Sequence, residues 1–180
     1  MFSPFSGTGK SGASGFLLGG SMVERALIEK VKEKFPSEVV DTREFRDEVT
    51  LVVRKDAIVG IIRFLHDDLA FNILKDLCGV DHYPSHPRFE VVYHLYSLER
   101  NERVRVKASL EEGETISTVE SVWKGANWYE REAFDLFGIV FENHSNLKRI
   151  LLWDEFEGNP LRKDFPTEGR DFEDPMIPEG

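Results

Sequence analysis

The sequence contains a single cysteine, Cys78, among its 180 residues. One thiol cannot close a disulfide within the chain, and it cannot supply the four cysteines that usually hold an iron–sulphur cluster. A free cysteine most often behaves as a small buried side chain, which is the role we expect for Cys78. The chain is therefore neither a disulfide scaffold nor, by itself, the carrier of a cluster with four cysteine ligands.

The sequence also lacks a long apolar run and an excess of basic residues, and each absence excludes a class of protein. No apolar run approaches the roughly 20 residues that a membrane-spanning helix needs, so we expect no direct membrane insertion. Lysine and arginine number 23 against 33 acidic residues, which gives a net charge of −10. Because affinity for nucleic acid comes mainly from basic contacts to phosphates, we expect no nucleic-acid binding. A hydrophobic content of 41% is typical of a globular domain.

Hydrophobic periodicity predicts an α+β fold. It consists of two helix–hairpin units that form an antiparallel sheet with helices packed on it, plus an extended C-terminal arm. Apolar residues at three- and four-residue spacing predict helices, and alternating apolar residues predict strands. The predicted helices are 22–35, 56–65, 71–78 and 118–137, and the predicted strands are 39–45, 48–54, 89–98 and 103–110.

Composition divides the chain into three parts. Residues 1–21 are rich in glycine and serine, which predicts a disordered leader or an expression remnant. Residues 22–157 form one α+β domain. Residues 158–180 are acidic towards their end and contain several prolines, so we expect an extended arm with an interface loop.

The helix predicted at 126–137 has two unlike faces. Ala126, Tyr129 and Ala133 form an apolar stripe, and Gly138 stands where a left-handed C-cap belongs. On the other face, Arg131 and Asp135 are four residues apart, so the spacing predicts an ion pair. This face also carries an aromatic residue among its charges, which indicates that it is covered, either by this chain or by another.

Several polar residues are candidates for catalysis or metal binding. Glu130 and Glu132 point in different directions on a helix, so a structural or interface ion-pair cluster is favoured over acid–base catalysis. His144 is interpreted as a hydrogen-bonded structural residue, because no nucleophile or orienting group stands near it in the sequence. His82 and His86 lie among prolines that forbid a regular helix, so a surface loop is favoured over a metal site.

Two basic groups have two interpretations each. Arg103, Arg105 and Lys107 alternate along one strand, and they indicate either a solvated face or a surface for an acidic partner. Arg162 and Lys163 lie in a proline-bounded loop. The loop is interpreted as an interface hook, and the alternative is a segment tied back onto its own core.

Four motifs from 130 to 166 together resemble the signature of one family, the C subunit (30 kDa subunit) of respiratory complex I, the NADH:quinone oxidoreductase. Ser145, where proline is usual, and Lys148, where arginine is usual, are the departures from it. The motifs are Glu-Arg-Glu (130–132), Asp-Leu-Phe-Gly-Ile (135–139), Leu-Lys-Arg-Ile-Leu-Leu (147–152) and Pro-Leu-Arg-Lys-Asp-Phe-Pro (160–166).

The resemblance implies a non-redox scaffold subunit of the hydrophilic arm, peripheral on the cytoplasmic side of the bacterial inner membrane. It implies docking beside the quinone-site D subunit and the terminal-cluster B subunit, in support of electron transfer from NADH to quinone coupled to proton translocation. NADH, FMN, iron–sulphur clusters and quinone would belong to the rest of the complex, and we expect no catalytic, cofactor or metal residue here. The interface candidates are Glu130, Arg131, Glu132, Asp135, Arg149, Arg162, Lys163 and Asp164.

Two alternatives remain. The first is the homologous subunit of a related membrane-bound hydrogenase or of another quinone or cofactor dehydrogenase. The second is a stand-alone soluble enzyme that uses Glu130, Glu132 or His144, and it predicts activity from the isolated chain.

Overall fold

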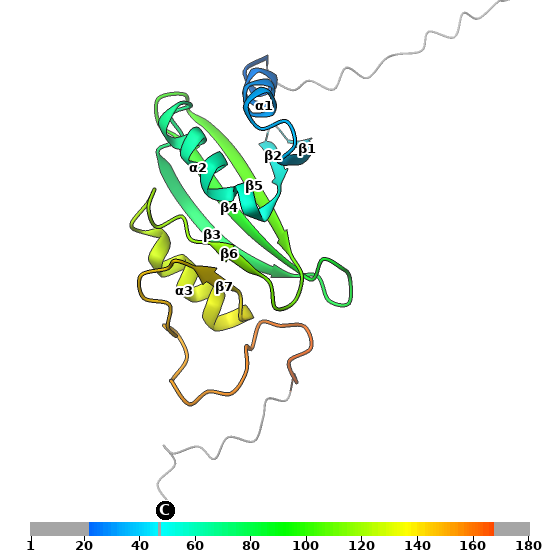
Figure 1. Cartoon of the computed structure of the whole chain (residues 1–180), viewed down its shortest axis with the longest axis vertical. Helices are drawn as coiled ribbons and strands as arrows, with labels where there is room; N and C mark the ends of the chain where they lie inside the picture. Colours follow the sequence, from blue (N-terminus) through cyan, green and yellow to red (C-terminus); the bar gives the residue numbers. More distant parts are fainter. Residues whose placement is uncertain (1–21, 47, 168–180) are drawn as a thin grey trace, which may run out of the picture.

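The computed structural model describes residues 22–46 and 48–167 (Figure 1). The predictions for residues 1–21 and for most of the acidic tail lie outside this part. No helix within these described ranges is long and apolar enough to cross a bilayer. The elements are α1 (Met22–Lys34), β1 (Val39–Phe45), β2 (Glu48–Val53), a 3₁₀ turn (Lys55–Ala57), α2 (Ile58–Asp67), β3 (Ile73–Asp81), β4 (Phe89–Ser97), β5 (Glu102–Leu110), β6 (Thr115–Ser117), α3 (Ala126–Phe137) and β7 (Val140–Glu142).

The five long strands form one sheet in the order β1-β2-β5-β4-β3. The α+β class and both predicted hairpins, β1–β2 and β4–β5, are confirmed. The sheet is mixed, however, because β2 and β5 pair in parallel. The chain leaves β2 through α2 and enters the sheet again at its far edge, so β5 returns beside β2 in the same direction.

Two predicted helical segments are wrong. Residues 71–78 belong largely to strand β3, whose burial does not alternate regularly and whose register shifts between Leu74 and Asp76. Pairing with β4 along this irregular edge overrides the three-residue spacing of Phe71, Leu74 and Leu77. Residues 118–123 contain turns only, and α3 begins at Ala126.

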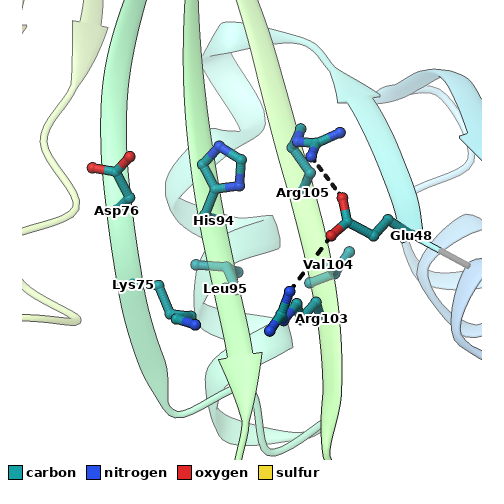
Figure 2. Close-up of a pocket in the computed structure, with 8 residues that line it drawn as sticks. All are labelled: Glu48, Lys75, Asp76, His94, Leu95, Arg103, Val104 and Arg105. Carbon is teal, nitrogen blue, oxygen red and sulfur yellow. Dashed lines mark hydrogen bonds and ion pairs between the residues drawn. The ribbon is translucent and has the colours of Figure 1, made fainter. Parts of the chain in front are cut away.

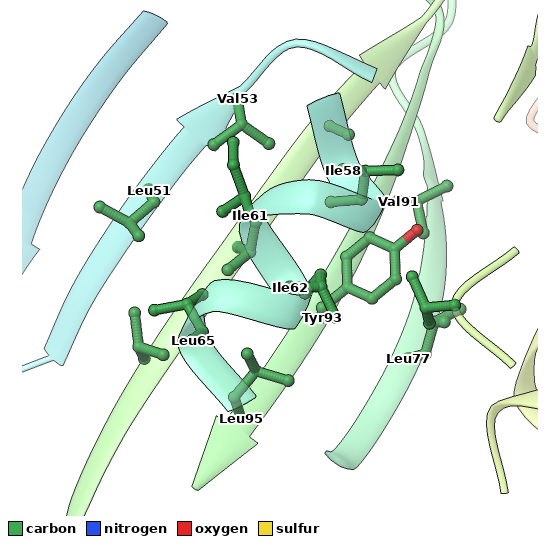
Figure 3. Close-up of a cluster of buried hydrophobic side chains, with 14 of the residues drawn as sticks. Leu51, Val53, Ile58, Ile61, Ile62, Leu65, Leu77, Val91, Tyr93 and Leu95 are labelled. Carbon is green, nitrogen blue, oxygen red and sulfur yellow. The ribbon is translucent and has the colours of Figure 1, made fainter. Parts of the chain in front are cut away.

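The core lies between α2 and one face of the sheet (Figure 3). Ile58, Ile61, Ile62 and Leu65 of α2 are completely buried there. Burial of one such side chain contributes roughly 1.5–3 kcal/mol. Tyr93 lies in the same core, and among the described residues its hydroxyl is the buried side-chain polar atom without a hydrogen-bond partner.

Helix α3 covers the same face of the sheet as α2. Leu77 of β3 lies in the core beside α2, and Gly79, two residues on, lies against Phe137 of α3. Residues two apart in a strand share a face, so α2 and α3 lie on one side. The opposite side, which we call the open face, carries polar side chains of β3, β4 and β5 (Figure 2). Helix α3 is flanked by β6 and β7, which pair in parallel as a second, small sheet.

Candidate functional site

Helix α3 and the irregular segment that follows β7 contain most of the residues singled out in the sequence. The helix ends as predicted, because Gly138 adopts the left-handed conformation with φ of 79° and donates its N–H to Phe134. Ala126 and Ala133 of the predicted stripe are buried against the core. The opposite face is covered by residues 147–159 of the same chain, so the choice between this chain and another is settled for that face.

Asp135 organises this covering segment. Its carboxylate has no exposed surface. One oxygen accepts the backbone N–H groups of Ile150, Leu151 and Leu152 at 3.0, 2.8 and 3.0 Å. The other accepts a guanidinium N–H of Arg149 at 2.6 Å. Burial alone would raise the pKa of Asp135, but these four donors outweigh it and hold the pKa below its ordinary value.

The predicted pairing of Arg131 with Asp135 is wrong. Arg131 donates instead to the backbone carbonyls of Lys148 and Arg149 at 3.0 and 2.9 Å, and it stacks on the ring of Trp128. The i,i+4 spacing allowed the pair, but the covering segment offers both side chains better partners. Arg149 also holds the later part of the segment, because its second terminal nitrogen donates to the carbonyls of Phe156 and Gly158.

Glu130 is also fully buried. It accepts the Thr118 hydroxyl at 2.5 Å and the Val119 N–H at 2.8 Å, and the His144 ring lies 3.7 Å away. Burial raises the pKa of Glu130 to about 7. Glu132, two residues along, is exposed, so the two carboxyls do not converge, as the helical spacing predicted.

His144 forms structural hydrogen bonds, as expected. Its Nδ1 accepts the N–H of Asn146 at 3.0 Å, and its Nε2 lies 3.2 Å from the carbonyl of Asn127. An Nδ1 that accepts carries no proton, so Nε2 bears the hydrogen and donates it to that carbonyl. Both ring nitrogens are therefore used: Nδ1 stabilises the turn after β7, and Nε2 binds this turn to α3.

The loop 161–166 is tied back onto the core, which was the alternative to an interface hook. The backbone N–H of Lys163 donates to Asp81 at 2.8 Å, and Asp164 pairs with Arg88 at 2.7 Å. Arg162 pairs with Asp164 and with Glu112. The side chains of Lys163 and Asp164 keep exposed surface.

Arg88 is the central residue of this network, and the sequence pattern did not reveal it. Its side chain is 5% exposed, and it binds Asp81, Glu112 and Asp164. Hydrogen bonds to these carboxylates raise its pKa, and the Arg88 and Arg162 guanidinium groups hold the pKa of Asp164 well below its usual range. The one available signal was an arginine directly before the alternating strand at Phe89.

The basic row on β5 is paired within the chain. Arg105 lies 2.7 Å and Arg103 lies 3.8 Å from Glu48 (Figure 2). Lys107 lies 2.7 Å from Glu90. These contacts favour the interpretation of a solvated face.

The interface candidates therefore divide into two groups. Glu130 and Asp135 have no exposed surface, so neither side chain can contact a partner while the chain has this structure. Arg131 donates its hydrogen bonds to the covering segment, and Arg149 donates to Asp135 and to carbonyls within that segment. Glu132, Lys163 and Asp164 are exposed, and Arg149 and Arg162 keep 20% and 22% of their side-chain surface, so contact between these candidates and a partner stays a prediction.

Comparisons with known proteins identify the family. Residues 51–171 match the model of the respiratory-chain NADH dehydrogenase 30 Kd subunit. The C subunit of the NADH-quinone oxidoreductase of Geotalea uraniireducens is 51% identical over 150 residues, which cover 83% of this chain and 91% of that protein. A C subunit of the same enzyme from Rhizobium meliloti is 53% identical over 130 residues, covering 71% and 70% of the two chains.

A solved structure agrees with these relatives. A chain in the membrane-bound sulfane sulfur reductase, an archaeal respiratory membrane complex, superposes with a TM-score of 0.69 and 26% identity, covering 79% of this chain and 85% of that one. The fold, the α3 motifs and the similarity over most of the chain all indicate the same family. The chain belongs to the family of the 30 kDa subunit, or C subunit, of the respiratory-chain NADH dehydrogenase.

Proposed function

We propose that the chain is a scaffold subunit of an NADH:quinone oxidoreductase, and that it aligns the quinone-site D subunit with the terminal-cluster B subunit. The observation that carries this proposal is the 51% identity to the C subunit of such an enzyme over 83% of the chain. In this proposal the complex transfers electrons from NADH to quinone and couples the transfer to proton translocation, with the chain peripheral on the cytoplasmic side of the inner membrane.

The docking surface that we propose consists of exposed apolar side chains on α3 and on the segment after β7. They are Trp128, Leu151, Trp153 and Leu161, between 51% and 61% exposed. Exposed apolar residues that gather on a monomer mark interaction sites, and tryptophan is frequent among residues that dominate binding. Glu132 and Lys163 come from the same elements and would contribute charge at the rim.

We assign the redox chemistry to other subunits. Of the three groups that a stand-alone enzyme could use, Glu130 and His144 are engaged in internal hydrogen bonds, and Glu132 is exposed and does not converge with Glu130. A general base must reach the proton that it removes, and a carboxyl without exposed surface cannot do so. NADH, FMN, the clusters and quinone are accordingly assigned to the neighbours, and the isolated chain should not oxidise NADH.

Co-purification tests the proposal. The full chain is tagged and expressed with the B- and D-type subunits of its own genome, and retention of both is measured. Leu151→Ser should weaken retention at least tenfold, whereas the matched control Leu98→Ser should not, because Leu98 is similarly exposed (63% against 61%) but lies outside the proposed surface. Folding of each variant is checked by thermal unfolding.

Three results would overturn parts of the proposal. A folded chain that retains neither subunit would contradict the scaffold role, and NADH oxidation by that chain would favour the stand-alone enzyme. Equal retention by both leucine variants would place docking elsewhere. The archaeal likeness favours a second candidate, a sulfur-reducing or hydrogenase-type complex, and preferential capture of subunits from such a complex would support it.

A further inference from the structure

Three side chains with different donor atoms converge on the open face of the sheet. A carboxylate oxygen of Asp76, the Sγ of Cys78 and a ring nitrogen of His94 all lie within 4.8 Å of one another. The register explains this convergence, because Asp76 and Cys78 are two residues apart in β3 and Asp76 stands directly opposite His94 in β4. Figure 2 shows Asp76 and His94 side by side on neighbouring strands.

These three side chains are not engaged in other interactions of the usual kind. Within residues 22–46 and 48–167, none of them forms a hydrogen bond or an ion pair. Two charged neighbours on the same face are paired, Arg105 with Glu48 and Lys107 with Glu90, and Lys75 lies over the ring of Tyr96. These neighbours thus have partners within the chain, whereas Asp76, Cys78 and His94 place three potential metal-binding atoms at one point.

The donor set selects a class of ion. Thiolate, imidazole and carboxylate are ligands of zinc and of similar transition metals, whereas magnesium and calcium take oxygen ligands. We propose that Asp76, Cys78 and His94 bind a divalent zinc-class ion, with water as the fourth ligand. Bonds of about 2.0–2.3 Å in a tetrahedron place the donor atoms roughly 3.3–3.8 Å apart, so small side-chain rotations would close the site.

The surrounding acidic side chains favour the binding of a cation, and the surrounding basic side chains oppose it. Negative charge from Asp76 and Glu132 acts on Cys78 and attracts a cation, while Lys107 and Arg105 oppose it. Burial raises the pKa of the Cys78 thiol, which opposes metal binding. We therefore expect weaker binding than at a site with four cysteines.

Cobalt titration of the full chain tests the site, because a Co²⁺–thiolate bond produces a charge-transfer absorption band. The wild type should show this band, and Zn²⁺ should abolish it by competition. Cys78→Ser should lose the band, and Asp76→Asn and His94→Gln should each weaken Co²⁺ binding at least about tenfold, since even outer-shell changes have effects of that size. His86→Gln is the matched control, because His86 pairs with Glu111 away from the site, and it should bind Co²⁺ like the wild type.

A second readout is the melting temperature, which Zn²⁺ should raise in the wild type and in His86→Gln but not in Cys78→Ser, because an ion that binds only the folded state stabilises it. A folded wild type without the cobalt band would overturn the proposal. So would a band of unchanged affinity in both Asp76→Asn and His94→Gln, since it would show that the thiol binds metal without the other two side chains.

Discussion

Replacement of Asp135 by asparagine tests whether this carboxylate holds the segment after β7 in place. Asparagine has nearly the same shape, but it is uncharged and has one acceptor oxygen. If that oxygen faces the N–H groups of Ile150, Leu151 and Leu152, the amide NH₂ faces Arg149. If the amide is turned round, its NH₂ faces the three backbone donors instead. Either orientation leaves buried donors without an acceptor.

The expected loss follows from the burial of the pair. Removal of one partner of a buried ion pair costs about 3–5 kcal/mol. The side chain of Arg149 is 20% exposed and keeps its hydrogen bonds to the carbonyls of Phe156 and Gly158, so we expect a cost at the low end of that range. We expect Asp135→Asn to lower the free energy of unfolding by about 3 kcal/mol, which shifts the urea midpoint down by about 1–2 M.

Urea unfolding of the full chain measures this loss, with Glu132→Gln as the control. Glu132 is exposed on the same helix, so its neutralisation should change stability by less than about 0.5 kcal/mol. Because folding lowers the pKa of Asp135, its contribution is present above the ordinary value of 3.8 and lost as the pH falls through the folded value. The difference in unfolding free energy between wild type and Asp135→Asn should therefore shrink as the pH falls below 3.8. A loss under about 1 kcal/mol at neutral pH would refute the reasoning.

Two further predictions concern the packing around α3. Folding raises the pKa of Glu130 from 4.5 to about 7, so its contribution to stability is complete below 4.5 and is lost as the pH rises through 7. Between pH 5 and 8 the wild type should lose about 2.5 kcal/mol more than Glu130→Gln, measured by urea midpoints, and equal losses in the two proteins would contradict this. A Cβ on Gly79 would lie 2.8 Å from the Phe137 ring, so Gly79→Ala should cost about 1–3 kcal/mol in thermal unfolding. Gly125→Ala, which has open space around it, should be neutral, and equal effects would refute the packing argument.

Local signals predicted most of the fold correctly. Strands β4 and β5 follow from the alternation of apolar residues, because one face of each packs in the core, although β4 departs from the pattern at the buried Val92. The end of α3 follows from Gly138, since a left-handed residue favours glycine. The parallel pairing of β2 with β5 had no such signal, because it depends on which sheet edge the chain reaches after α2.

The candidate site was harder to predict because its partners are mostly backbone groups. Asp135 was singled out, but its three N–H donors belong to residues whose side chains play no part in the contact. Every residue except proline has such a group, so the sequence carries no mark of the contact. The spacing of Arg131 and Asp135 was compatible with a pair, yet partners distant in the chain had better geometry. Arg88 escaped notice for the same reason, because its carboxylates lie in three separate segments.

The family motifs and the docking surface therefore have different roles. Residues 147–167 form no helix or strand, so only some of their backbone groups pair with one another, in turns, and others need side-chain partners. Asp135, Arg149 and Asp81 supply these partners, and an apolar replacement of equal volume could not. The motif charges thus fix the shape of an irregular segment, and that shape presents Leu151 and Leu161 outwards. Substitution of a buried motif charge such as Asp135 therefore tests the shape of the segment. Only substitution of an exposed side chain such as Leu151 tests docking.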